Sequence, residues 1–171
     1  TDDLSVPIAE GPELEYSSKE GVLLRYDTGS KSWLMLPHRS IVRTGEELAS
    51  PAPFHAWLEV LQKTARVTML DATRVKVLPP SDAALCGFNV SRGRLLFQAN
   101  QPQVILSFAI GERVWRLELL TGDALCGLEV KRRLPNHYEE EILDNMYLAR
   151  LIVGRGTVRL SDGDEHVYML D

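Results

Sequence analysis

The two cysteines of the chain are its first candidates for a chemical role, because each lies in a copy of nearly the same seven-residue phrase. ALCGFNV occupies residues 84–90 and ALCGLEV occupies residues 124–130, a spacing of forty residues. A duplicated strand, a disulfide, a metal site and a catalytic cysteine with a spare would each explain this repeat. A structural zinc site needs four ligands in tight clusters, typically C-x2–4-C. The two cysteines are isolated in the sequence, so a metal site is disfavoured.

Cys86 and Cys126 are predicted to be buried and reduced, at equivalent positions of two neighbouring strands. Free cysteine is among the most often buried residue types and packs as a small hydrophobe. Gly87 and Gly127 follow them and are typical of a bulge or a close backbone approach at a strand start, in matching local geometry. A disulfide is the alternative, because paired strands bring Cα atoms within the roughly 4.4–6.8 Å that a bridge requires. The phrase is either a structural repeat, for which the forty-residue period is suitable, or a convergence of two similarly buried strands.

Three tryptophans, Trp33, Trp57 and Trp115, are the candidate ligand-binding residues. They could stack on a carbohydrate, but each lies inside an apolar run, which favours core packing. The histidines are scattered without metal-ligand spacing, at His38, His55, His137 and His166. The sequence contains no G-x-S-x-G, P-loop or G-x-G-x-x-G motif. We therefore predict a protein that is not an enzyme and needs no cofactor and no metal.

Charge restricts the class of partner. The chain has a formal net charge of −5 and a pI near 5.4, whereas phosphate binding needs a concentrated positive surface. Nucleic acid and anionic lipid are therefore not expected as partners. The basic pairs Arg92/Arg94 and Arg132/Arg133 are interpreted as solvated strand ends rather than an anion site.

The two ends of the sequence predict a fragment of a longer protein. The chain begins TDDLSV, without an initiator Met, and no signal peptide is visible. It contains no run of about 18 apolar residues, the length that a membrane-spanning helix needs. Any attachment to a membrane is expected through a segment upstream of the sequence.

Strands are the elements that must position these residues. Short runs rich in Val, Leu, Ile and aromatics recur every 8–12 residues or so, which indicates an all-β fold. In VWRLEL, Trp115, Leu117 and Leu119 alternate with more polar neighbours, as in a half-buried strand. We expect many short strands forming a β-sandwich or a β-solenoid-like module, with at most one or two short helices.

The domain is predicted to cover residues 19–171, preceded by a linker or arm over residues 1–18, where Pro, Gly and acidic residues are frequent. A hairpin is expected at about residues 147–170, with GRG at 154–156 as a hairpin connection. The segment PNHYEEEILDN predicts a short helix from about His137 to Asn145, because Asn136 is a suitable N-cap and acids fill the first turn.

The segment after Pro53 carries two conflicting patterns. Phe54, Trp57, Leu58 and Leu61 have helical spacing, but alternate residues from Phe54 to Val60 are apolar, as in a strand. Tertiary context overrides such weak propensities. We predict a strand from about His55 to Leu61, followed by a turn at Gln62-Lys63.

The runs WLMLPHRSIVRTGEELASPAPFHAWLEVL, ARVTMLDATRVKVL and GFNVSRGRLLFQ resemble the FecR-like extracytoplasmic domain family. The features of that family fall here on Trp33, Thr44-Gly45-Glu46, Leu48, Val67, Thr73, Val75, Leu78, Gly93 and Leu95. The terminal LIVGRGTVRLSDGDEHVYML is similar to the closing hairpin of the family, so the resemblance covers residues 20–171. The chain departs from the family at Gln62-Lys63, where Asp-Gly is usual. It also lacks the anti-sigma helices and membrane span that precede the domain in FecR proteins.

The resemblance implies an all-β periplasmic module that performs no catalysis. Such a module receives a signal from an envelope protein, a receptor or a regulator, and relays it. A rigid β scaffold with edges available for strand addition suits that role. The alternative is a β-rich module that binds envelope polysaccharide through one or more of the tryptophans.

Overall fold

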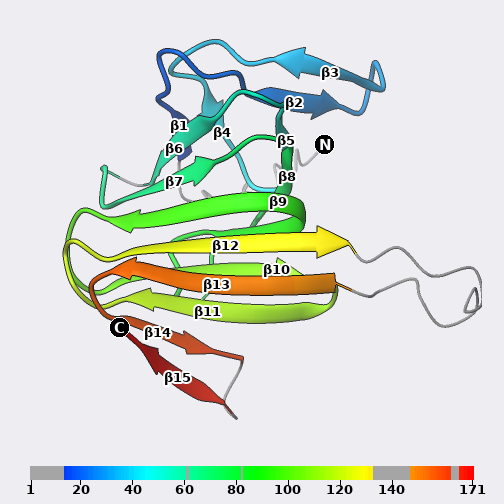
Figure 1. Ribbon diagram of the computed structural model, residues 1–171. Helices are drawn as coiled ribbons and strands as arrows, with labels where there is room; N and C mark the ends of the chain where they lie inside the picture. Colours follow the sequence, from blue (N-terminus) through cyan, green and yellow to red (C-terminus); the bar gives the residue numbers. More distant parts are fainter. Residues whose placement is uncertain (1–13, 61, 82, 133–146, 163–165) are drawn as a thin grey trace, which may run out of the picture.

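The computed structural model describes residues 14–60, 62–81, 83–132, 147–162 and 166–171. These residues form fifteen strands and no helix (Figure 1), which confirms the all-β prediction. The predicted helix at His137–Asn145 lies outside the described residues.

Two sheets share one long strand, β9 (Gly87–Ala99). Sheet A consists, in spatial order, of β4 (Ile41–Val42), β1 (Leu14–Tyr16), β6 (Ala56–Val60), β7 (Ala65–Met69), the C-terminal half of β9, β12 (Leu125–Arg132) and β13 (Tyr147–Arg155). Sheet B consists of β3 (Ser32–Met35), β2 (Leu24–Asp27), β5 (Glu47–Ser50), β8 (Thr73–Leu78), the N-terminal half of β9, β10 (Val104–Ile110), β11 (Arg113–Leu119), β14 (Val158–Ser161) and β15 (Val167–Leu170). Neighbouring strands are antiparallel except β9 and β10, which are parallel.

The inner faces of the two sheets enclose one hydrophobic core. Alternate residues of each strand point inward: in β6, for example, Ala56, Leu58 and Val60 are fully buried. Phe97 of sheet A and Phe108 of sheet B stack with ring centroids 6.3 Å apart. In Figure 1, β12 and β13 lie across β10 and β11. Because both sheets contribute to one core cluster, the fold is a sandwich rather than a solenoid.

Strand β9 changes sheet at Gly93. This residue has a φ of +106°, and a Cβ atom placed on it would overlap Thr73 of β8. Thr73 holds the bend with two hydrogen bonds: its Oγ1 donates to Arg94 O (2.9 Å) and accepts from Arg94 N (2.8 Å). The pairing of β8 with β9 shifts register at the same place, between Arg74 and Val75. Only glycine combines this positive φ with so close an approach.

The strand predicted for His55–Leu61 is confirmed as β6, which runs from Ala56 to Val60. The turn predicted at Gln62-Lys63 is also present, and both residues have left-handed φ angles of 49° and 64°. In β6 and at the residue before it, Ala56, Leu58 and Val60 point inward while His55, Trp57 and Glu59 point outward. The apolar Trp57 lies on the outward face, and this residue produced the helical spacing in the sequence.

Two predicted boundaries were wrong. The arm over residues 1–18 does not extend to its end, because β1 pairs with β4 and β6 and buries Leu14 and Tyr16 in the core. The hairpin over residues 147–170 is shorter than expected, since β13 pairs with β12 while only β14 and β15 pair with each other. The GRG segment therefore crosses between sheets. Gly156 has a φ of +72°, and a Cβ atom placed on it would overlap Thr121 and Ala124.

Candidate binding surfaces

Both cysteines are buried and reduced, but they do not occupy equivalent positions. Cys86 immediately precedes β9 and accepts a hydrogen bond from Ser107 N (2.9 Å), whereas Cys126 lies within β12 opposite Phe97 of β9. The two therefore lie at different ends of β9. Burial raises the pKa of each thiol to about 12. The thiols are inert core groups, because the thiolate is the reactive form.

The glycines of the repeated phrase also differ in their surroundings. A Cβ on Gly87 would overlap the hydroxyl of Ser107 on the parallel neighbour β10, whereas the atom nearest to a Cβ on Gly127 would be Leu96 Cδ2, at 3.3 Å. The prediction of matching local geometry was wrong. Similar burial, not a duplicated structural unit, accounts for the repeated letters.

The tryptophans lie in three separate surroundings and form no joint platform. Trp33 on β3 contacts Tyr26 and has the Arg74 guanidinium over its ring at 5.1 Å. Trp115 on β11 stacks on Phe108, 6.4 Å between centroids, at the edge of the core. Trp57 points outward from β6 and is half-buried. Trp57 lines a pocket on the outer face of its strand.

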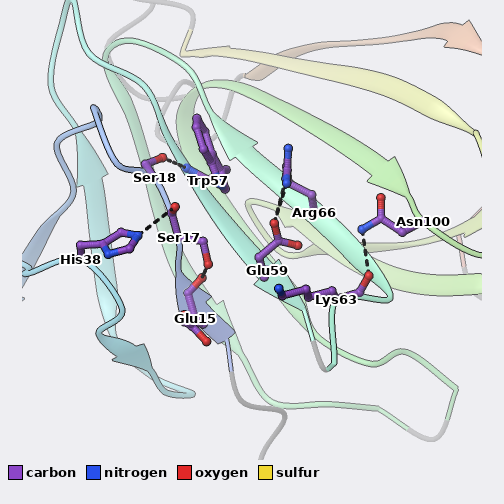
Figure 2. A network of polar contacts seen from close by, with 9 residues as sticks. All are labelled: Glu15, Ser17, Ser18, His38, Trp57, Glu59, Lys63, Arg66 and Asn100. Atoms are coloured by element: carbon purple, nitrogen blue, oxygen red, sulfur yellow. Dashed lines mark hydrogen bonds and ion pairs between the residues drawn. The ribbon is translucent and has the colours of Figure 1, made fainter.

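A pocket of about 530 Å³ lies on the outer face of sheet A, over β1 and β6 (Figure 2). We call it the sheet A pocket; its lining includes Glu15, Ser17, His38, His55, Trp57, Glu59, Lys63 and Arg66. The alternation of β6 brings His55, Trp57 and Glu59 to this face. The first strand and the loop before β4 close it from the other side.

Hydrogen bonds fix the frame of the sheet A pocket. The backbone N–H of Trp57 donates to Ser18 Oγ (2.7 Å), and the His38 ring contacts the carbonyl of Ser17 (3.2 Å) (Figure 2). The Trp57 ring has two close neighbours: the Arg66 guanidinium at 5.3 Å and the His55 ring at 6.2 Å. Arginine over an aromatic face is a favourable arrangement, so the ring is held in place by its neighbours.

Glu59 is the most unusual residue of the sheet A pocket. It is only 7% exposed. Both Nε and Nη2 of Arg66 donate to its Oε1, at 3.0 and 2.7 Å. Its Oε2 is buried and has no hydrogen-bond partner among the described residues. Buried carboxylate oxygens are normally bonded, so Oε2 retains the capacity to accept a donor.

Sequence reasoning missed this grouping. His38 and His55 are far apart in the sequence, but both line the sheet A pocket, while His166 lies near Asp162 on the far hairpin. One signal for the pocket was present in HAWLEV (residues 55–60): a strand there directs His55, Trp57 and Glu59 to the same face. Its partners on β1 and in the loop before β4 had no signal, because they come from distant parts of the chain. No three His, Cys, Asp or Glu side chains of the described residues gather as metal ligands do.

The last strand, β15, forms an apolar edge of sheet B. Val167, Tyr168 and Met169 are 60%, 46% and 55% exposed, respectively. β15 pairs with β14 on one side, and no described strand pairs with its other side. Figure 1 shows the β14–β15 hairpin at the end of the sandwich, beyond β11 and β13. An apolar edge with unpaired backbone groups is a site for strand pairing with another chain.

No family model, curated protein or solved structure matches this chain. The described residues include no helix that is long and apolar enough to cross a membrane.

Proposed function

We propose that this chain is a non-catalytic interaction module of the cell envelope, which binds an envelope protein outside the cytoplasm and relays a signal from it. The open, apolar edge at β15 carries the proposal. The FecR resemblance supports the location and the signalling role. The occupant that we propose for this edge is an extended segment of the partner protein with apolar side chains.

The geometry of β15 suits strand addition. Asp162 N donates to His166 O (3.3 Å), and bonded pairs recur at every second residue of an antiparallel ladder. The N–H groups of Val167 and Met169 therefore point away from β14, toward the open edge. Tyr168 shares the inner face with Leu160, so an added strand would also extend the core face.

The test uses a photo-crosslinking amino acid at Tyr168, expressed in cells of the source organism. We expect a crosslink to an envelope protein. Met169→Pro removes an outward N–H without breaking the ladder to β14, so it should abolish the crosslink while the melting temperature stays nearly unchanged. Met169→Ala keeps the N–H and should retain the crosslink. A crosslink that survives the proline, or one that forms equally from the exposed Lys31 turn, would contradict the proposal.

The sheet A pocket favours a second candidate function, the binding of a neutral envelope polysaccharide. Its basic and acidic side chains nearly balance, and Trp57, Glu59 and the two histidines offer an aromatic ring and hydrogen-bonding groups, as sugar sites do. Polysaccharide extracted from the source organism's envelope should change the fluorescence of the protein. Trp57→Phe should remove that change and Trp115→Phe should keep it; the reverse result would exclude this pocket.

A further inference from the structure

A second groove, of about 780 Å³, lies where β9 passes from one sheet to the other. We call it the corner groove. The turn between β7 and β8 and the bend at Gly93 both leave sheet A here, while β12 continues straight alongside β13. One side of the corner groove is therefore formed by β8 and β9 and the other by the end of β12.

The corner groove is basic, in a chain that is acidic overall. Five cations line it, Arg74, Arg92, Arg94, Lys131 and Arg132, against two carboxylates, Asp71 and Glu129. The cations of the lining outnumber its carboxylates by three, and Glu47 outside the lining pairs with Arg74 (2.6 Å), whereas the whole chain has a net charge of −5. One surface is thus lined by Arg92, Arg94 and Arg132, from the two basic pairs of the sequence. The fourth residue of those pairs, Arg133, lies outside the described residues.

The ion pairs in the corner groove are exposed and exchangeable. Arg94 pairs with Asp71 at 2.6 Å and Lys131 with Glu129 at 3.1 Å, and the two basic side chains are 48% and 64% exposed. Exposed pairs contribute only about 0.2–1 kcal/mol each. Arg92 forms no ion pair with another described residue and stands directly opposite Arg74 in the β8–β9 ladder. Glu47 already pairs with Arg74 at 2.6 Å, so Arg92 is the cation of this cross-strand pair that remains available to an incoming carboxylate.

The backbone of β12 adds a feature that a simple charge cluster lacks. The ladder between β12 and β9 ends at Val130↔Gly93, whereas the ladder between β12 and β13 continues to the end of β12. Successive residues of a strand direct their N–H and C=O groups to alternate sides. The last two residues of β12, Lys131 and Arg132, therefore present backbone groups at the edge that β9 no longer covers, next to the cations.

We propose that the corner groove binds an acidic peptide segment of a partner protein, in an extended conformation. Arginine forks bind carboxylates in bidentate geometry, and the end of β12 supplies backbone pairing. A free phosphate or polyphosphate uses the cations but not the strand edge, so the backbone geometry favours a peptide. The site is distinct from the β15 edge, and it can hold or fail independently of the interaction proposed there.

The probe is a capped hexapeptide of alternating glutamate and threonine, titrated into the purified full chain at low salt. We expect saturable binding that weakens at least about tenfold in Arg92→Glu, from the loss of a charged hydrogen bond, and similarly in Lys131→Glu. Lys31→Glu makes the same charge change in the exposed β2–β3 turn and should leave binding unchanged. Melting temperatures establish that each variant is folded.

A second peptide of equal charge, N-methylated at alternate amides, tests the strand pairing. It should bind at least about tenfold more weakly, because it cannot donate backbone hydrogen bonds. Absence of binding, equal losses in Arg92→Glu and Lys31→Glu, or equal affinity of the methylated peptide would each contradict the proposal. Sodium tripolyphosphate binding as tightly as the peptide would instead assign the groove to phosphate-bearing polymers and would also overturn it.

Discussion

At the residue scale, Gly93 decides how the two sheets are joined. Its φ of +106° lies in a region that side chains rarely adopt, and Thr73 leaves no room for a Cβ atom. Gly127 has neither constraint: its φ is ordinary and its nearest neighbour is the end of the flexible Leu96 side chain.

Gly93→Ala is therefore expected to lower the free energy of unfolding by about 2–4 kcal/mol, from left-handed strain and overpacking together. Gly127→Ala is the matched control and should cost under about 1 kcal/mol. Urea titration followed by circular dichroism measures both. Equal losses in the two variants would show that the bend does not depend on Gly93.

The two thiols provide a second prediction at this scale. Because burial raises the pKa of Cys86 and Cys126 to about 12, both stay protonated at pH 8 in the folded chain. Labelling by iodoacetamide should be at least about a hundredfold slower than in the urea-unfolded chain, where the thiols have their ordinary pKa. Rapid labelling of either cysteine in the folded chain would be inconsistent with its burial.

The raised pKa of the two thiols makes the stability of the folded chain depend on pH. Because the pKa of each thiol is higher in the folded chain, the thiol contributes to the free energy of unfolding. This contribution is fully present below the unfolded-state pKa, near 9, and is lost as the pH rises toward 12. The stability difference between the wild type and Cys86→Ala/Cys126→Ala should therefore shrink as the pH rises above about 9.

At the element scale, the β6–β7 turn is stabilised by its surroundings rather than by its residues. Gln62 and Lys63 both have positive φ, which costs roughly 1–2 kcal/mol per non-glycine residue. Asn100 compensates by donating from its Nδ2 to Lys63 O (2.8 Å) and from its backbone N to Thr64 O (3.0 Å). The strands that the turn joins are fixed by burial, so an unfavourable turn is tolerated.

Replacing Gln62-Lys63 by Asn-Gly should raise the free energy of unfolding by about 1 kcal/mol, because both residues tolerate left-handed angles. Lys63→Ala, which keeps the strain, serves as the control and should bring no gain. The urea midpoint of each variant measures the effect. A midpoint that falls in the Asn-Gly variant would indicate that the lysine side chain stabilises the turn by a contact of its own.

At the scale of the whole molecule, β9 and the single core make the two sheets one cooperative unit. Trp57 reports on sheet A and Trp115 on sheet B. Variants in which Trp57 alone or Trp115 alone remains of the three tryptophans therefore follow the two sheets separately. We expect the same urea midpoint from both, as for a two-state domain. A difference between the midpoints would show that the sheets unfold independently.

The binding surfaces depend on residues that are distant in sequence. The sheet A pocket brings His38 to His55 and Glu15 to Glu59, and the corner groove brings Arg92 to Lys131. Local patterns indicate only which side of a strand a residue occupies. Which strands become neighbours is decided by long-range pairing, for which the sequence contains no local signal.

Local patterns predicted the all-β class, the strand at Ala56–Val60 with its turn, and the burial of both cysteines. These features follow from alternation and composition, which act within a few residues. Three features became visible only in the folded chain: β1 belongs to the core, β13 pairs with β12 instead of the closing hairpin, and the repeated phrases are not equivalent. The reason is physical: a strand has two edges and two faces, and its partners are selected by the packing of the whole core.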